Sequence, residues 1–160
     1  MKPITILIAK YTTILLVASL ISWWLLYFSN FNIPKNIPST PIRIDGIIIM
    51  SIVLTTFIFA QKELIKICPD SSVIKLMLAG TLIAFFSELI FQSIRVFTLE
   101  DDRLYYFLKG VIGMTIFDTI ISFFVAYQIK TKNTNRLILL IIVLLVLVKI
   151  MLYLFPSILG

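Results

Sequence analysis

Five long apolar segments dominate the sequence, and each is about as long as a helix that crosses a lipid bilayer. They cover residues 4–28, 44–65, 73–97, 104–129 and 137–155. A spanning helix needs roughly 20 mainly apolar residues, because the hydrocarbon core is about 30 Å thick. Inside that core the backbone must satisfy its own hydrogen bonds, which a helix does within one segment. The sequence therefore predicts an all-α, polytopic membrane helix bundle with five transmembrane helices.

The composition excludes the other broad classes of protein. Of the 160 residues, 60% are hydrophobic and only 14% are charged. Soluble domains are about 45–50% apolar and about 25% charged, and disordered chains are more polar still. Because the connections between the apolar segments are short, residues 1–160 are predicted to form one transmembrane domain. Its first predicted partner is the lipid bilayer.

The second apolar segment leaves an alternative open, because its apolar core is short. This core, residues 46–60, is preceded by Arg43 and Asp45 and followed by Lys62. The segment crosses the bilayer if the Lys62 side chain snorkels to the interface and the helix continues through Ile65. Otherwise it is a re-entrant or interfacial segment, and the bundle has four transmembrane helices.

The connections indicate the orientation of the chain in the membrane. Residues 29–43 contain three prolines, which break helices, and are predicted to form an outer loop. Lys and Arg in short connections favour the cytoplasmic side. With five spans, the side of the N-terminus collects Lys2, Lys10, Lys62, Lys66, Lys75, Lys130, Lys132 and Arg136, and the other side collects Lys35, Arg43, Arg95, Arg103 and Lys109. We therefore expect a cytoplasmic N-terminus and an outer C-terminus, in a bacterial inner (plasma) membrane or, alternatively, an organellar inner membrane.

The residue counts exclude most catalytic and cofactor chemistry. The chain has no His, and Cys68 is its single cysteine. These counts exclude His-ligated haem, catalytic zinc and Ser-His-Asp catalysis. The sequence also lacks a glycine-rich phosphate-binding motif. We therefore predict no enzyme activity, no catalytic residue, no metal and no cofactor. The net charge of +6 is explained by the Lys and Arg residues that flank membrane spans, so no nucleic-acid binding is predicted.

Three ionisable residues lie deep inside the apolar segments. They are Glu88, Asp118 and Lys149, and each is close to the middle of its segment. At about 1.5 Å of rise per residue, all three lie within roughly 5 Å of one membrane level. Charges at this depth are costly and turn inward, so we predict one buried intramembrane charge cluster. Either Lys149 neutralises a carboxylate as a structural pair, or the carboxylates form an ion or proton site.

Small and polar residues share faces on the third and fourth segments. Such faces let membrane helices approach closely and form hydrogen bonds across the contact. We predict a helix-packing or partner face that consists of Gly80, Ala84, Gln92, Arg95, Gly110, Gly113, Met114 and Ser122.

Two classes of function remain open at this stage. The first is a small, non-catalytic integral membrane protein that acts as a structural or accessory subunit of a larger membrane complex. Its polar and small helix faces would contact other membrane subunits, or a second copy of the chain. The alternative is a small oligomeric transporter or ion or proton channel that uses Glu88, Asp118 and Lys149. The sequence identifies neither a substrate nor a partner.

Overall fold

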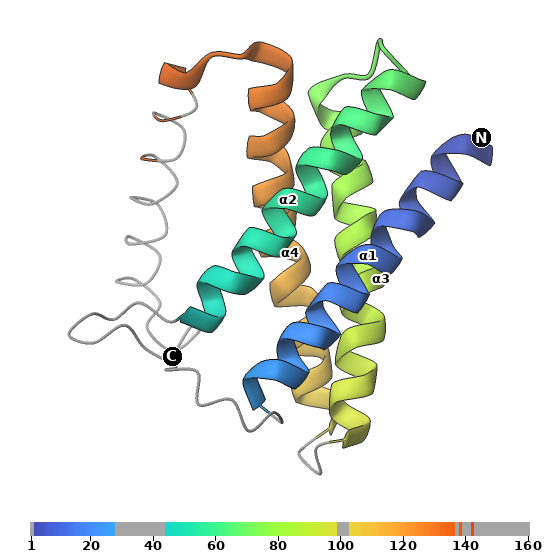
Figure 1. The fold of residues 1–160 in the computed structure, drawn as a ribbon, viewed down its shortest axis with the longest axis vertical. Coiled ribbons are helices and arrows are strands. Elements are labelled where there is room, and N and C mark those ends of the chain that lie inside the picture. Colours follow the sequence, from blue (N-terminus) through green and yellow to red (C-terminus); the bar gives the residue numbers. More distant parts are fainter. Residues whose placement is uncertain (1, 28–43, 99–102, 137, 139–141, 143–160) are drawn as a thin grey trace. The chain divides into compact units, whose positions relative to one another are not determined.

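The computed structural model describes residues 2–27, 44–98, 103–136, 138 and 142 (Figure 1). Its elements are the helices α1 (Lys2–Tyr27), α2 (Ile44–Ile67), α3 (Val73–Thr98) and α4 (Arg103–Thr131). With 24 to 29 residues, each helix is roughly 36–44 Å long. All four are long and apolar enough to cross a membrane. The prediction of helices is confirmed for the described residues, and four of the predicted segments have the length and apolar content of membrane spans.

Two of the predicted segments cannot be compared with the structure. The predicted fifth span, residues 137–155, lies outside the described residues except for Ile138 and Ile142, and so does the proline-rich loop 29–43. The chain divides into two compact units, Met1–Ala126 and Tyr127–Gly160, which are described separately.

α2 is one continuous helix through the part of the chain that the sequence left uncertain. The helix passes the exposed Lys62 and continues beyond Ile65 to Ile67. This is the condition under which the short apolar core 46–60 becomes long enough to cross a bilayer.

A short turn separates α2 from α3. The Cys68 amide donates to the Leu64 carbonyl (2.8 Å), and the Ser71 amide donates to the Cys68 carbonyl (3.1 Å). The Ser72 hydroxyl oxygen then accepts a hydrogen bond from the Lys75 amide (3.3 Å). Ser72 is therefore the N-cap of α3, which satisfies one of the amides that a helix start leaves free.

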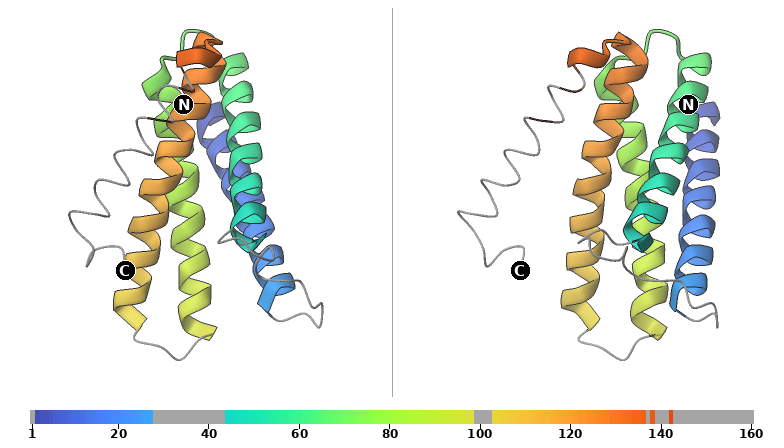
Figure 2. Two further views of the ribbon diagram at one scale, coloured as in Figure 1. Left: turned by 90° about the vertical axis from the view of Figure 1, so that its left-hand side faces the viewer. Right: turned by 60° about the vertical axis from the view of Figure 1, so that its left-hand side comes forward.

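Side-chain contacts give the directions of the first three helices. Tyr11, near the start of α1, reaches Glu63, near the end of α2, so these helices are antiparallel. The rings of Trp23 and Phe91 meet edge to face at 6.0 Å, close to the ends of α1 and α3, so these helices run in the same direction. α1 contacts both α2 and α3, as Figure 2 shows.

α3 and α4 are antiparallel and closely packed within the first unit. Gly80 lies against Ser122, and Gly110 lies against Gln92. A methyl group on Gly80 would overlap the Ser122 hydroxyl, and one on Gly110 would lie only 2.7 Å from the Gln92 side-chain carbon. The small residues are therefore required by the close approach of the two backbones. The most deeply buried large side chains of the core are Leu7, Leu15, Phe57, Leu76 and Ile83.

The second unit begins with the last turn of α4. The Lys132 amide donates to the Gln128 carbonyl (2.9 Å), and Lys132 has a φ of 51°, a left-handed conformation common after helix ends. The Asn133 side chain accepts a hydrogen bond from the Arg136 amide (3.1 Å). A short polar turn at Lys132 and Asn133 therefore follows α4.

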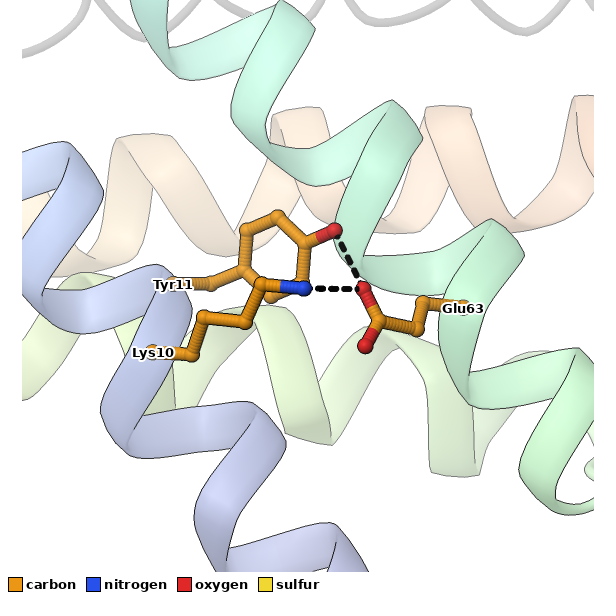
Figure 3. A network of polar contacts seen from close by, with 3 residues as sticks. All are labelled: Lys10, Tyr11 and Glu63. Atoms are coloured by element: carbon orange, nitrogen blue, oxygen red, sulfur yellow. Dashed lines mark hydrogen bonds and ion pairs between the residues drawn. The ribbon is translucent and has the colours of Figure 1, made fainter.

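A polar contact joins α1 to α2 (Figure 3). One oxygen of Glu63 accepts hydrogen bonds from the Lys10 ammonium (2.7 Å) and the Tyr11 hydroxyl (2.7 Å). The Lys10 and Glu63 side chains are 48% and 36% exposed, so solvent and lipid headgroups weaken the ion pair, whereas Tyr11 is buried. The Tyr11 hydroxyl is therefore the more important donor.

We expect Tyr11→Phe to lower the thermal unfolding midpoint of the purified protein more than Lys10→Met does. The phenylalanine keeps the buried ring but removes the hydroxyl that holds Glu63, whereas Lys10 contributes an exposed charge. Thermal unfolding in detergent, followed by circular dichroism, measures both changes. A larger loss for Lys10→Met would show that the ion pair is the main connection between α1 and α2.

Candidate functional site

Asp118 is the most unusual buried group in the described part of the chain. It lies in the middle of α4, and only 1% of its surface is exposed. Neither of its carboxyl oxygens has a hydrogen-bond partner among the described residues. Burying a polar group without a partner is costly, and lipid surroundings make an ionisable group more costly still. A residue of this kind in a membrane helix is a candidate for function.

Asp118 lies on the wall of a pocket between α2 and α4. The pocket has a volume of about 320 Å³ and is lined by Ile49, Met50, Val53, Met114, Phe117, Asp118 and Ile121. All the lining residues except Asp118 are apolar. Met50 and Phe117 are 45% and 46% exposed, so the pocket reaches the surface of the helices. Its volume lies within the range of small-molecule sites, about 300–1,000 Å³.

A second carboxyl group, Glu88 on α3, is buried near Asp118. Glu88 is 8% exposed, and its carboxylate accepts a hydrogen bond from the Gln92 amide (3.1 Å). The charge of Glu88 acts on Asp118, and the charge of Arg95 acts on Glu88. Two acidic side chains from adjacent helices therefore share one region of the interior, and among the described residues only Glu88 has a hydrogen-bond donor.

A network of hydrogen bonds fixes α4 one turn beyond Asp118. The Gln61 amide on α2 donates to the Ser122 hydroxyl (2.9 Å) and the Ser122 carbonyl (3.0 Å). The Ser122 hydroxyl donates to the Met77 carbonyl on α3 (3.1 Å). Because Ser122 is four residues after Asp118, this network sets both the rotation and the height of the Asp118 side chain against α2 and α3.

The predicted packing face is divided by the structure. Between α3 and α4, Gly80 lies against Ser122 and Gly110 lies against Gln92, and Ala84 is fully buried. Met114 lines the pocket instead, Arg95 is exposed, and a Cβ atom added to Gly113 would meet no heavy atom within 4 Å apart from its own chain neighbours and the backbone of α4.

The predicted charge cluster is described only in part. Glu88 and Asp118 lie in the same interior region, whereas Lys149 lies outside the described residues. The three-residue cluster therefore stays a prediction.

Sequence reasoning missed Gln61 and the pocket. Gln61 follows an apolar run and precedes Lys62 and Glu63, so it resembles the polar end of a span. Because α2 continues to Ile67, Gln61 lies inside the helix and not at its end. The continuation of the helix beyond Gln61 is the feature that could have indicated a buried side chain. Within the described ranges, no group of three or more His, Cys, Asp or Glu side chains could hold a metal ion.

No protein-family model, characterised protein or solved structure shows significant similarity to this chain. Function is therefore inferred from the geometry around Asp118.

Proposed function

We propose that this chain is a small, non-catalytic membrane transport protein in which Asp118 is the cation-binding carboxyl group. The supporting observation is the Asp118 side chain itself, which is 1% exposed, lies on the wall of an open pocket and has no hydrogen-bond partner among the described residues. The lack of His and the single Cys support a role without catalysis.

The physical reason is that a proton or cation stabilises a buried carboxylate that lacks a hydrogen-bond partner. When the site is empty, the charge of Asp118 stands in apolar surroundings beside a second acid, Glu88. Binding a proton or cation neutralises that charge and removes the repulsion. Because the carboxylate lies deep within a span, an occupant that exchanges with both sides of the membrane would be transported.

Proton flux into proteoliposomes tests this proposal. Vesicles that contain a pH indicator and an inward-negative potential, set by a potassium gradient with valinomycin, should acidify faster with the protein than without it. Asp118→Asn should reduce this rate to that of empty vesicles, because the amide cannot take up the proton. Asp70→Asn, which makes the same change in an exposed turn, is the matched control and should keep the rate. Equal flux for both variants would contradict the proposal.

We further propose five spans in a bacterial inner membrane, with the N-terminus in the cytoplasm. In a Cys68→Ser background, cysteines introduced at Asn36 and Asp101 should react with an impermeant thiol reagent added outside, and one at Asn133 should not. The basic residues of the short connections support this orientation. External labelling of both Asn36→Cys and Asn133→Cys would show that residues 44–65 do not cross the membrane.

A second candidate function is a structural or accessory subunit of a larger membrane complex. The observation that favours it is the opening of the pocket between Met50 and Phe117, through which a basic side chain of a neighbouring helix could reach Asp118. Mass measurement after mild solubilisation distinguishes the two functions. Co-purification with other polypeptides at fixed stoichiometry supports the subunit, and a homo-oligomer supports the transporter.

A further inference from the structure

We propose that the pocket between α2 and α4 binds an organic monocation, an ammonium group on an apolar body, with Asp118 as its counter-ion. This inference names the substrate class of the site and therefore rests on the proposed function. It follows from the combination of one carboxyl group that has no hydrogen-bond partner in the described ranges with a wall that is otherwise apolar.

The side chains that line the pocket favour a ligand with an apolar surface. Six of the seven lining residues are Ile, Met, Val or Phe, and Asp118 is the only polar one. A ligand that fills about 320 Å³ beside these side chains removes apolar surface from both partners. The single carboxyl group adds one point of charge recognition, so a ligand with one positive group and an apolar body matches the wall.

Other ligand classes match the wall less well. Ca²⁺ and Mg²⁺ take six or more oxygen ligands, and the lining residues offer the carboxyl group of Asp118 alone. A hydrated sodium or potassium ion would have to lose water against apolar side chains, at a large electrostatic cost. A neutral hydrocarbon would fill the volume but would leave the carboxylate without a partner.

Phe117 strengthens the preference for an organic cation. Phe117 directly precedes Asp118 in α4, and both residues line the pocket. Aromatic rings attract quaternary ammonium groups through their negative faces, and this attraction grows where water is excluded. A carboxylate and an aromatic ring on one wall therefore both favour a cation whose charge is buried in methyl or methylene groups.

The position of the opening indicates the route of entry. Phe117 is seven residues inside Gly110–Thr131, the part of α4 that is apolar enough to cross a membrane, or roughly 10 Å along the helix. Met50 and Phe117 are both partly exposed at the pocket. A ligand dissolved in the bilayer can therefore reach Asp118 from the side, which suits an amphiphilic cation that partitions into membranes.

Equilibrium dialysis with purified full-length protein in detergent tests this inference. The probe is radiolabelled benzyltrimethylammonium, and its neutral isostere, neopentylbenzene, has a carbon in place of the charged nitrogen. We expect saturable binding of the cation, at least tenfold tighter than binding of the isostere. Asp118→Asn should weaken cation binding at least tenfold, while Asp70→Asn should leave it unchanged.

A second variant tests the pocket without touching the carboxyl group. Met50→Trp places a larger side chain at the exposed edge and should weaken cation binding severalfold while the helices remain folded. Equal binding of the two probes, no binding, or competition by sodium or potassium chloride stronger than by unlabelled cation would each overturn the inference.

The outcomes separate this inference from the transport proposal. Cation binding is measured in detergent without a gradient, and proton flux is measured in vesicles without an organic cation. Retained, Asp118-dependent proton flux without cation binding would overturn the substrate class alone. Cation binding without Asp118-dependent proton flux would keep the binding site and overturn proton transport alone.

Discussion

Gly80→Ala is expected to destabilise the protein by about 1–3 kcal/mol, although it adds a single methyl group. A Cβ atom at residue 80 would overlap the Ser122 hydroxyl and lie 2.8 Å from the Ser122 Cβ. The two helices must separate to accept it, which also stretches the hydrogen bonds from Gln61 to Ser122 and from Ser122 to the Met77 carbonyl. The change therefore weakens the packing of α3 against α4 and the hydrogen bond from α2 to α4.

Gly113→Ala is the matched control for this prediction. Gly113 lies on α4, as Ser122 does, but a Cβ atom there would have no heavy atom within 4 Å. Since alanine favours helix over glycine by about 1 kcal/mol, Gly113→Ala should be neutral or stabilising. Denaturation of the detergent-solubilised protein by added sodium dodecyl sulfate, followed by circular dichroism, measures both variants. Equal destabilisation would show that close packing at Gly80 is not the cause.

A compensating change provides a stricter test of the same contact. Ser122→Gly removes the atoms that a methyl group on residue 80 would meet, at the cost of the hydroxyl that binds Gln61 and the Met77 carbonyl. The double variant Gly80→Ala, Ser122→Gly should therefore be more stable than the sum of the single changes predicts. Additive effects would mean that the two residues are not in contact.

The helices were predictable from the sequence because their signal is length and apolar content. Each bilayer-long apolar segment in the described part of the chain became a helix, and the turn before Val73 follows from Pro69 and the cap at Ser72. The boundaries differ by only a few residues, since helix ends extend until polar side chains or turn residues intervene. The structure adds most to the sequence at α2. Its apolar core, residues 46–60, is short enough for a re-entrant segment, whereas the structure has one continuous helix from Ile44 to Ile67.

The site was only partly predictable, because it depends on how helices rotate against one another. Depth along the chain identifies Glu88 and Asp118, since it needs only a count of residues. The pocket requires that Val53 and Asp118 face each other across α2 and α4. Both helices are apolar around most of their circumference, so no stripe in the sequence indicates the facing side. The partnership of Gln61 with Ser122 has the same origin.

Asp118→Leu is expected to stabilise the isolated protein by about 1–3 kcal/mol while it abolishes proton flux. The carboxyl oxygens have no hydrogen-bond partner among the described residues, so the substitution removes a buried polar group and sacrifices no described contact. The adjacent pocket of about 320 Å³ has room for the larger leucine side chain. Natural functional sites often carry such a cost in stability.

Ser122→Ala is the matched comparison for Asp118→Leu. Ser122 is equally buried on the same helix, one turn further on, but its hydroxyl accepts from Gln61 and donates to the Met77 carbonyl. Removing it leaves two buried groups without that partner, so Ser122→Ala should destabilise the protein where Asp118→Leu stabilises it. The same detergent denaturation measures both changes, and opposite signs are the expected result.

Destabilisation by Asp118→Leu would contradict the transport proposal and show that the carboxylate is held by a permanent cationic partner. The sequence offers Lys149 for that role, at a similar predicted depth. If Lys149 is the partner, Lys149→Leu alone should leave the carboxylate unpaired, and adding it to Asp118→Leu should recover the lost stability, because neither charge then remains buried alone. Failure to recover would assign the cation to a neighbouring subunit. A stabilised and inactive Asp118→Leu protein, in contrast, is the result that an exchangeable cation site requires.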